Sequence, residues 1–366
     1  MKSGTVLVGI NLLLKLIYLN LLIFNLGVDK YDAPLAFTID WISEFAKHCD
    51  VVVVLTMRQG DFKLPDNVKV YDIGHQKGYS KIRMGINFYA RLFYILHKYK
   101  INGCFSHMNQ LFSAMGGFIL KLKRIKLVTW YAHASITKSL KIAHYFSTHM
   151  VASVYEAYPY KKDKLVVIGQ GIDTLVFRRL GYNGEKTTIL YSGRISKVKD
   201  LETLIKAFKT VNEKFKHLKL LIVGDAKGKV DLEYKKFLLN LVLKFKLESN
   251  VEFIASKERS LLPEINNNAL MYINLTAPGS GDKVAWEAMA CETPTIVANS
   301  GMIDTLGKYT KMCLFEYNDD RDLADKMFNI IEMTPEERAE MGSYLRCNVI
   351  KFHSLENLPQ KVLSLL

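Results

Sequence analysis

Short runs of β-branched and aromatic residues alternate with longer amphipathic stretches along this chain, and this alternation restricts the fold most. The runs before residue 181 are LIYLN, VVVVLT, VKVYDI, GCFSH, LVTWYA, MVAS and LVVIG, with helical patterns such as INFYARLFYILHKY between them. Strands that alternate with helices build a parallel sheet covered by helices on both faces. The first half is therefore predicted to be a Rossmann-like, doubly wound α/β domain.

The alternation pauses at Gly181-Tyr182-Asn183-Gly184 and then starts again with TTILYSG, LKLLIVG, NVEFIA, ALMYINL, PTIVAN and CLFEY. A chain of 366 residues is long enough for two such domains. We predict one domain over 1–180, a second over 181–350, and a short C-terminal helix over 351–366, broken by Pro359, that could cross back to the first. Ligands bind beyond the carboxyl ends of parallel strands, so two facing sheets make an interdomain cleft the expected site.

The apolar stretch at residues 4–28 is long enough to span a membrane. Lys15 lies at its middle, however, and the helical pattern WISEFAKHCD needs a strand before it to enter a parallel sheet. We therefore predict that LIYLNLLIF forms the first strand behind an N-terminal extension. A signal anchor remains the alternative, and the lack of a small-residue cleavage site disfavours a cleaved signal peptide.

Positive charge is concentrated in the first half of the chain. Up to Asn183 there are 24 Lys and Arg against 11 Asp and Glu, whereas the remainder holds 26 against 25. Such a basic half suggests an anionic partner, either phospholipid, a phosphorylated substrate or nucleic acid. A merely soluble lysine-rich surface is the alternative, and no RNA-binding motif supports nucleic acid. The five cysteines show no paired spacing, which argues against a disulfide framework or zinc site and for a reducing compartment.

Two strand ends in the second half carry polar residues suited to a phosphorylated ligand. In YSGRISKVKDLETLIKAF, Arg194 and Lys199 flank a turn directly before a helix, where a guanidinium and an ammonium fit a diphosphate. In LKLLIVGDAKG, Gly224 and Asp225 follow a strand, and the glycine would let a ligand approach the backbone. Taken alone, the two cations could equally be solvated loop residues.

The stretch GSGDKVAWEAMACETP combines a glycine-rich loop with a carboxylate in apolar company. Asp282 is a candidate N-cap of the following helix, whose N-terminus favours an anion. Glu287 lies just over one turn further, among small and apolar residues, so it needs a hydrogen-bonding partner. The vicinal hydroxyls of a ribose would satisfy it, and a structural Glu bonded to backbone is the alternative.

Histidines follow two strands of the first domain. His133 in VTWYAHASITKSLKIAH ends one strand and precedes a helix, which places it at the expected cleft. His107 and Asn109 in FSHMNQ follow another strand. A buried core position is the alternative for each histidine.

Together and in this order, these motifs resemble those of the retaining glycosyltransferase family 4, which has the GT-B fold of two Rossmann-like domains. The resemblance covers roughly residues 15–360. It rests on Gly193, Arg194, Lys199 and Leu201, on Gly224, on Val251 and Phe253, on EAMACxTPxIV from Glu287, and more loosely on WYAH at 130–133 and GIDTLVF at 171–177.

The resemblance implies a role for each matching residue. Arg194 and Lys199 would hold the donor diphosphate, Glu287 the ribose, and His133 would lie beside the transferred sugar. The family usually has another Glu eight positions before Glu287, where this chain has Gly279. The donor-sugar loop would then rely on Ser280, Gly281, Asp282 and Lys283, the nucleotide would pass Gly193, Gly224 and Asp225, and His107 and Asn109 would face the acceptor.

The expected activity is metal-independent transfer of a sugar, with retention, from a nucleotide diphosphate sugar to a hydroxyl of a glycan or lipid-linked glycan. No cofactor, metal or nucleic acid is expected. We expect a cytoplasmic protein that docks on the inner, anionic membrane face through its basic first domain, with a helix at 81–100. The alternatives are a non-catalytic nucleotide-sugar-binding subunit, and a nucleotide-sugar epimerase or glycogen-type polymerase of the same fold.

Overall fold

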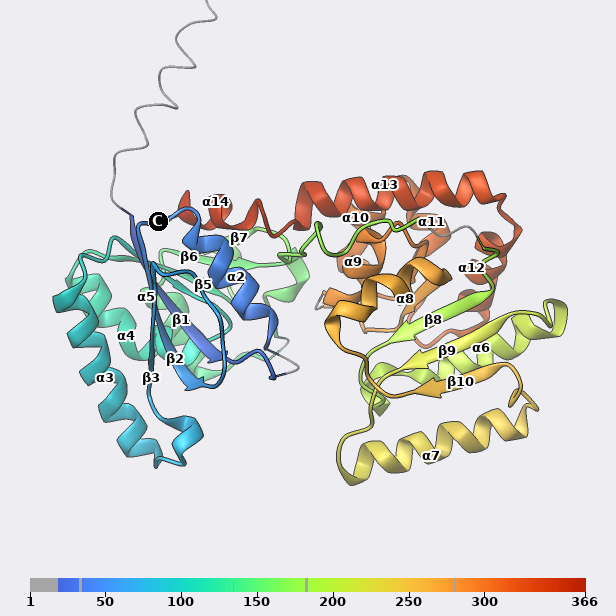
Figure 1. Cartoon of the computed structure of the whole chain (residues 1–366), viewed down its shortest axis with the longest axis horizontal. Coiled ribbons are helices and arrows are strands. Elements are labelled where there is room, and N and C mark those ends of the chain that lie inside the picture. Colours follow the sequence, from blue (N-terminus) through green and yellow to red (C-terminus); the bar gives the residue numbers. More distant parts are fainter. Residues whose placement is uncertain (1–18, 33–34, 134, 182–183, 280) are drawn as a thin grey trace, which may run out of the picture. The chain divides into compact units, whose positions relative to one another are not determined.

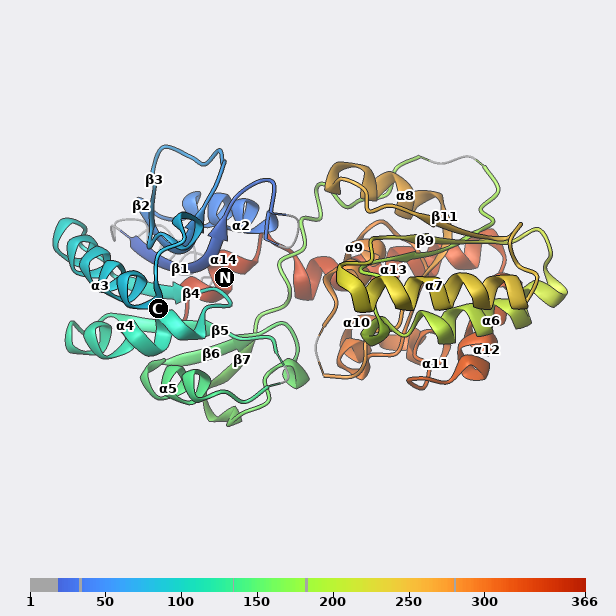
Figure 2. The ribbon, with the colours of Figure 1, turned by 90° about the horizontal axis from the view of Figure 1, so that it is seen from below.

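The computed structural model describes residues 19–32, 35–133, 135–181, 184–279 and 281–366, which form two compact units (Figure 1 and Figure 2). The first unit consists of the described parts of Met1–Tyr131 and Ile136–Val151, together with Pro359–Leu366. The second consists of the described parts of Ala132–Ser135 and Ala152–Leu358. The structure contains one seven-stranded and one five-stranded sheet, and the prediction of two parallel α/β units is confirmed.

The first sheet has the strand order β3-β2-β1-β4-β5-β6-β7, and its strands from β3 to β6 pair in parallel. The strands are β1 (Asn20–Val28), β2 (Val51–Gln59), β3 (Val68–Asp72), β4 (Gly103–Ser106), β5 (Lys126–Trp130), β6 (His149–Ala152) and β7 (Leu165–Val167). The helices of this unit are α2 (Phe37–Ala46), α3 (Lys81–Lys98), α4 (Gln110–Leu122) and α5 (Lys138–Phe146).

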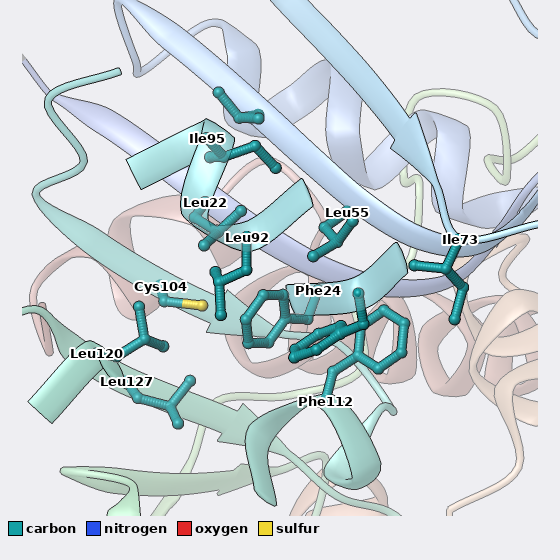
Figure 3. Close-up of a cluster of buried hydrophobic side chains, with 12 residues drawn as sticks. Leu22, Phe24, Leu55, Ile73, Leu92, Ile95, Cys104, Phe112, Leu120 and Leu127 are labelled. Carbon is teal, nitrogen blue, oxygen red and sulfur yellow. The ribbon is translucent and has the colours of Figure 1, made fainter. Parts of the chain in front are cut away.

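Both faces of β1 are buried, as expected for a parallel sheet covered by helices on each side. Leu22 and Phe24 point to one face, where they join Phe88 of α3 and Phe112 of α4 in an apolar cluster (Figure 3). The ring centroids of Phe88 and Phe112 lie 4.6 Å apart. Ile23 points to the other face, toward Trp41 and Phe45 of α2. The period-two alternation of β1 thus separates two helical layers.

The second sheet has the order β10-β9-β8-β11-β12, again with parallel pairs. Its strands are β8 (Thr188–Ser192), β9 (Lys219–Val223), β10 (Val251–Ile254), β11 (Ala269–Asn274) and β12 (Thr295–Val297). Its helices are α6 (Leu201–Lys214), α7 (Gly228–Lys244), α8 (Leu262–Asn268), α9 (Lys283–Ala290), α10 (Ile303–Leu306), α11 (Thr310–Cys313), α12 (Asp320–Glu332) and α13 (Pro335–His353).

Three local predictions need correction. The predicted first strand is present but ends at Val28 rather than at Phe24, since β1 covers Asn20–Val28. The extension and anchor alternatives concern residues 1–18, which lie outside the described residues. CLFEY is not a strand, because α11 occupies its start and Leu314 makes a single parallel bridge to Val297. In the described chain, no helix is both long enough and apolar enough to cross a membrane.

Pro359 does not break the C-terminal helix, which is the third correction. It is the second residue of α14 (Leu358–Leu363), where a missing N–H leaves no helical hydrogen bond unmade. The segment Pro359–Leu366 belongs to the first unit. Its last side chain, Leu366, packs onto Gly103 of β4, where an added Cβ would lie 2.8 Å from it.

Candidate functional site

The candidate site lies where the order of the second sheet changes direction. β8 has β9 and β10 on one side and β11 and β12 on the other. At such a switch point the loops beyond two neighbouring strands diverge and leave room for a ligand at the carboxyl ends. The loop after β8 leads to Lys199, and the loop after β11 leads to Asp282. The sheet therefore brings together residues that are 83 positions apart in sequence.

Lys199 is held between these two loops. It ends the short 3₁₀ helix η5 (Lys197–Lys199), and its ammonium Nζ donates to Asp282 Oδ2 at 2.5 Å and to Thr276 Oγ1 at 2.9 Å. Thr276 Oγ1 donates in turn to Asp282 Oδ2 at 2.5 Å. Burial raises the pKa of the Asp282 carboxyl, but the charge of Lys199 and its hydrogen bonds outweigh this and leave the pKa below its usual value. Asp282 is thus an ionised anchor for the Lys199 ammonium.

Asp282 does occupy the N-cap position of α9, but the predicted capping by its side chain is wrong. The residue is extended and its carboxylate makes no capping hydrogen bond. The reason is competition: the carboxylate is turned toward Lys199 and Thr276, which bind it at charge-assisted distances. The start of α9 and the loop after β8 are consequently coupled through one carboxylate.

Two glycines shape the loop before α9. Gly279 has φ +118°, a conformation that strains any residue with a Cβ, so a Glu at this position would be unfavourable. Gly281 lies against the indole of Trp286, and an added Cβ would overlap that ring. Trp286 is itself fixed, since its Nε1 donates to Thr305 Oγ1 at 3.2 Å. Ser280, the remaining residue of the predicted loop, lies outside the described residues.

Arg194 projects from the loop directly after β8. Its side chain is 56% exposed, its Nε lies 3.3 Å from Ser196 Oγ, and it reaches 4.0 Å from a carboxylate oxygen of Asp231 on α7. Its backbone is held firmly, because the Tyr191 hydroxyl donates to the Arg194 carbonyl at 3.1 Å. Arg194 is therefore an accessible guanidinium on a fixed loop.

Gly193 and Gly224 directly follow the neighbouring strands β8 and β9 and lie against each other. A Cβ on Gly224 would overlap the carbonyl oxygen of Gly193. The backbone thus runs close at these strand ends, as expected where a ligand approaches the main chain. Asp225, the next residue, accepts from the Ser256 hydroxyl, and hydrogen bonds from Ser256 lower the pKa of its carboxyl. Asp225 therefore ties β9 to the loop after β10.

Glu287 is buried in α9, with 4% of its surface exposed. Two cations face its Oε1: Lys283 Nζ at 3.6 Å and Arg259 Nε at 3.8 Å, both beyond hydrogen-bonding distance. Burial raises the pKa of the Glu287 carboxyl, and the charges of Lys283 and Arg259 only partly oppose the shift. Glu287 is thus a desolvated carboxylate whose Oε1 faces two cations. A structural Glu bonded to backbone stays the alternative to a ribose-binding Glu.

Sequence reasoning missed Arg259 and Thr276. Arg259 lies in the 3₁₀ helix η6 (Arg259–Leu261) after β10, with its guanidinium 5.4 Å from the ring centre of Phe177. Thr276 follows β11 by two residues. Neither belongs to a motif, but both follow a strand of the same sheet. A survey of every polar residue beyond every strand end would have found them.

His133 lies in the second unit, in the segment Ala132–Ser135. It is exposed, and its Nδ1 lies 3.1 Å from the Ser135 backbone N and 2.9 Å from the Ser135 hydroxyl. The Ser135 N–H donates to Nδ1, so the ring is oriented by its own loop. The alternative of a buried core histidine is wrong for His133.

His107 and Asn109 follow β4 in the first unit, and both are buried. The His107 ring packs against Trp41 with centroids 4.3 Å apart, and its Nδ1 lies 3.3 Å from Asn25 Oδ1. Asn109 caps α4 by accepting from the Phe112 N–H at 3.1 Å. These contacts give both residues a structural role, and a role toward the acceptor stays a prediction.

No group of three or more His, Cys, Asp or Glu side chains in the described ranges is arranged to hold a metal ion. The cations of the site instead come from the chain: Arg194, Lys199, Arg259 and Lys283. The arrangement offers positive charge at the switch point and one buried carboxylate beside it.

Comparison with known proteins agrees with this geometry. Residues 173–346 match the family model described as glycosyl transferases group 1. A capsular polysaccharide biosynthesis glycosyltransferase, CapM of Staphylococcus aureus, is 24% identical over 229 residues, which span 57% of this chain and 58% of that relative. The alignment thus covers little more than half of the curated relative.

Solved structures show the same fold over nearly the whole chain. HepE of Anabaena, in complex with UDP and glucose, has a TM-score of 0.71 at 17% identity and covers 94% of this chain and 98% of its own. Sucrose-phosphate synthase of Thermosynechococcus elongatus has a TM-score of 0.74 at 16% identity, with 95% and 98% covered. Residues 173–346 are therefore similar to the glycosyl transferases group 1 family, and the chain has the GT-B fold of two parallel α/β domains that these solved structures share.

Proposed function

We propose that this protein transfers a sugar from a nucleoside diphosphate sugar to a hydroxyl group, with retention at the anomeric carbon. The proposal rests on the cluster of side chains at the switch point of the second sheet. There Lys199 is fixed between two loops, and Glu287 lies buried in α9, the helix that follows the second of these loops. The fold relative HepE holds UDP and glucose, which supports a ligand of this class.

Lys199 and Arg194 are proposed to bind the diphosphate. When the bond between the anomeric carbon and the phosphate oxygen breaks, the electron pair stays on the diphosphate, which gains negative charge. Fixed cations aimed at that charge stabilise the transition state without having to reorganise. Lys199 meets this condition because Asp282 and Thr276 already hold its ammonium. The N-terminus of α9 adds the positive end of a helix dipole.

Glu287 is proposed to accept hydrogen bonds from the two ribose hydroxyls. Its Oε1 lies 3.6 Å from Lys283 Nζ and 3.8 Å from Arg259 Nε, and both distances exceed that of a normal hydrogen bond. A buried carboxylate in this state gains most from two hydroxyl donors. The charges of Lys283 and Arg259 oppose the rise in the pKa of Glu287 that burial causes, and so favour the ionised form.

We propose that the acceptor hydroxyl attacks on the face from which the diphosphate leaves. The acceptor oxygen forms the new bond to the anomeric carbon, and its proton passes to the departing phosphate oxygen. Lys199 and Arg194 take the electrostatic role that a metal plays in other transferases, so the reaction needs no metal or cofactor. His133, exposed and oriented by Ser135, is proposed to lie beside the transferred sugar.

The acceptor is proposed to be a glycan or a lipid-linked glycan. CapM, the curated relative, acts in capsular polysaccharide biosynthesis, which is a glycan-building process. The basic first half of the chain further supports work on the cytoplasmic, anionic face of a membrane, where lipid-linked acceptors are found.

One observation favours a second candidate, a non-catalytic subunit that binds nucleotide sugar. Gly279 offers no side chain to the donor sugar, and its φ of +118° suits no carboxylate-bearing residue. Such a subunit would bind the nucleotide sugar through Lys199 and Glu287 but would not cleave it, so no free nucleotide would form.

The deciding experiment incubates the protein with a panel of nucleotide sugars and measures released nucleotide. Arg194→Ala and Lys199→Ala should each lower the release rate about 10²- to 10³-fold, because each removes a charge-assisted contact to the developing anion. Lys197→Ala is the matched control, since Lys197 is an exposed cation two residues from Lys199 in the same 3₁₀ helix. Release within about threefold of the parent in both variants would refute the diphosphate assignment. Nucleotide binding without release from any donor would favour the non-catalytic subunit.

A further inference from the structure

The helices α3, α4 and α5 form one layer over the first sheet (Figure 1 and Figure 2). α3 contacts α4 through a hydrogen bond from the Tyr89 hydroxyl to the Met115 carbonyl at 3.4 Å. α4 contacts α5 where Gly117 lies against Phe146, so that an added Cβ would come 2.9 Å from that ring. The inner side of the layer packs against the sheet, and Phe88, Leu92 and Ile95 of α3 are fully buried there.

The outer side of the same layer is also apolar. On α3, Ile82, Ile86 and Phe93 recur at helical spacing, and the first two are 79% and 64% exposed. Leu122 of α4 is 68% exposed and Tyr145 of α5 is 66% exposed. We call the outward side of α3, α4 and α5, with these exposed apolar side chains and the cations between them, the three-helix face. Large apolar side chains gathered on a surface mark a site of interaction.

The charge of this region is one-sided. Between Asp72 and Glu156 the sequence has twelve Lys and Arg and no Asp or Glu. Each helix of the layer contributes exposed cations, among them Lys81 on α3, Lys121 on α4 and Lys141 on α5. The Lys121 ammonium lies 5.1 Å from the centre of the Tyr145 ring, so cations and apolar groups are interleaved on this face.

A contrasting surface shows that the combination is specific to this layer. α7 in the second unit also exposes large apolar residues, including Val230, Leu239 and Leu243. It carries Asp231 and Glu233 among its lysines, however, so its charge is mixed. Of these two described surfaces, α7 combines exposed apolar residues with carboxylates, whereas the helices of the three-helix face carry no Asp or Glu.

We propose that the three-helix face docks on an anionic phospholipid bilayer, with its apolar side chains entering the headgroup region and its cations pairing with lipid phosphates. Helices that combine Lys and Arg with Phe, Leu and Ile lie in membrane interfaces in this manner, with long basic side chains reaching back to the headgroups. Charge complementarity selects this occupant. A second copy of the chain would oppose the same cations across a symmetric interface, and a carboxylate-free face has nothing to neutralise them.

Docking through this face deepens the proposed function, because it places the first unit on the membrane that would carry a lipid-linked acceptor. The docking itself does not depend on the chemistry proposed for the second unit. Loss of vesicle binding and loss of nucleotide release are separate measurements, so failure of one leaves the other standing.

The test is co-sedimentation of the full chain with phosphatidylcholine vesicles that contain or lack phosphatidylglycerol. The parent should bind only the vesicles with phosphatidylglycerol. Lys81→Gln/Lys121→Gln/Lys141→Gln removes one cation from each helix and should lower the partition coefficient on the order of a hundredfold. Ile86→Ser/Phe93→Ser/Leu122→Ser keeps the charge and should lower it about tenfold or more. High salt should weaken binding of the parent, because it screens the electrostatic part.

Matched controls carry the same substitutions on α7. Lys229→Gln/Lys236→Gln/Lys244→Gln and Val230→Ser/Leu239→Ser/Leu243→Ser should bind vesicles as the parent does. Equal binding to both vesicle types, or parent-like binding by the variants of the three-helix face, would overturn the proposal. A stable dimer in sedimentation velocity that the Ile86→Ser/Phe93→Ser/Leu122→Ser variant abolishes would also overturn it, since the face would then belong to a second copy.

Discussion

Replacing Glu287 by Gln separates ligand binding from stability, because the two effects are expected to have opposite signs. Gln has nearly the same shape but carries no charge and accepts hydrogen bonds less strongly. Hydrogen bonds to a charged acceptor contribute about 1.5–3 kcal/mol each. Weakening two ribose contacts should reduce binding by about 2–3 kcal/mol in total, which corresponds to roughly a 30- to 150-fold higher Kd for a nucleoside diphosphate.

The expected effect of Glu287→Gln on stability follows from burial. Burial raises the pKa of the Glu287 carboxyl above its usual value, so the folded state disfavours the ionised form more than the unfolded chain does. The contribution of this group to stability is therefore highest below its ordinary pKa and falls as pH rises toward its raised folded pKa. Gln resembles the protonated form, so the variant should be as stable as the parent at pH about 4 and more stable at neutral pH.

The assay for Glu287→Gln combines thermal unfolding across this pH range with calorimetric titration of nucleoside diphosphates. Glu292→Gln is the matched control, because Glu292 follows the same helix but pairs with a largely exposed Arg179 at 3.4 Å. It should change neither property much. A Glu287→Gln variant that melts well below the parent at neutral pH, yet binds nucleotide normally, would refute the ribose assignment and show that the carboxylate is structural.

Two further substitutions test how the site is built. Asp282→Asn should destabilise the fold by about 1–3 kcal/mol, which is less than for a fully buried ion pair because the Lys199 side chain is a quarter exposed. The same variant should lower the rate of nucleotide release, because the Lys199 ammonium is no longer held in place. The pKa of Asp282 in the folded protein lies below its usual value. The difference in unfolding free energy between parent and variant should therefore be fully present above the ordinary pKa of an Asp carboxyl, and should shrink as pH falls through the lower pKa of the folded state. A difference that stays constant over this pH range would contradict the pairing. Gly224→Ala should destabilise the fold by about 1–3 kcal/mol, because its Cβ would overlap the Gly193 carbonyl, and a urea unfolding midpoint equal to that of the parent would show that the two strand ends are not in close contact.

The strands could be predicted from sequence because most of them are compact apolar runs between helical patterns. CLFEY does not form a strand, because α11 ends at Cys313, only Leu314 bridges to Val297, and a turn begins at Tyr317. Pro359 was misjudged because a proline that would break a helix interior is well accommodated in a first turn.

The positions of the site residues were predictable, but their pairings were not. Strand ends and a helix start indicated Lys199 and Asp282 separately, whereas their ion pair joins residues 83 positions apart and follows from the order of β8 and β11. Helical spacing relates Glu287 to Lys283, one turn before it. Arg259 reaches Glu287 through the tertiary fold alone, and no local pattern encodes that contact.

The most direct test of the donor site is calorimetric titration of UDP, GDP and ADP into the parent, Lys199→Ala and Lys197→Ala proteins in the presence of EDTA. At least one diphosphate is expected to bind the parent and the Lys197→Ala control equally, and to bind Lys199→Ala at least about tenfold more weakly. Binding by all three proteins with the same Kd, or by none of them unless a divalent metal is added, would contradict a donor site built on the Lys199 ammonium.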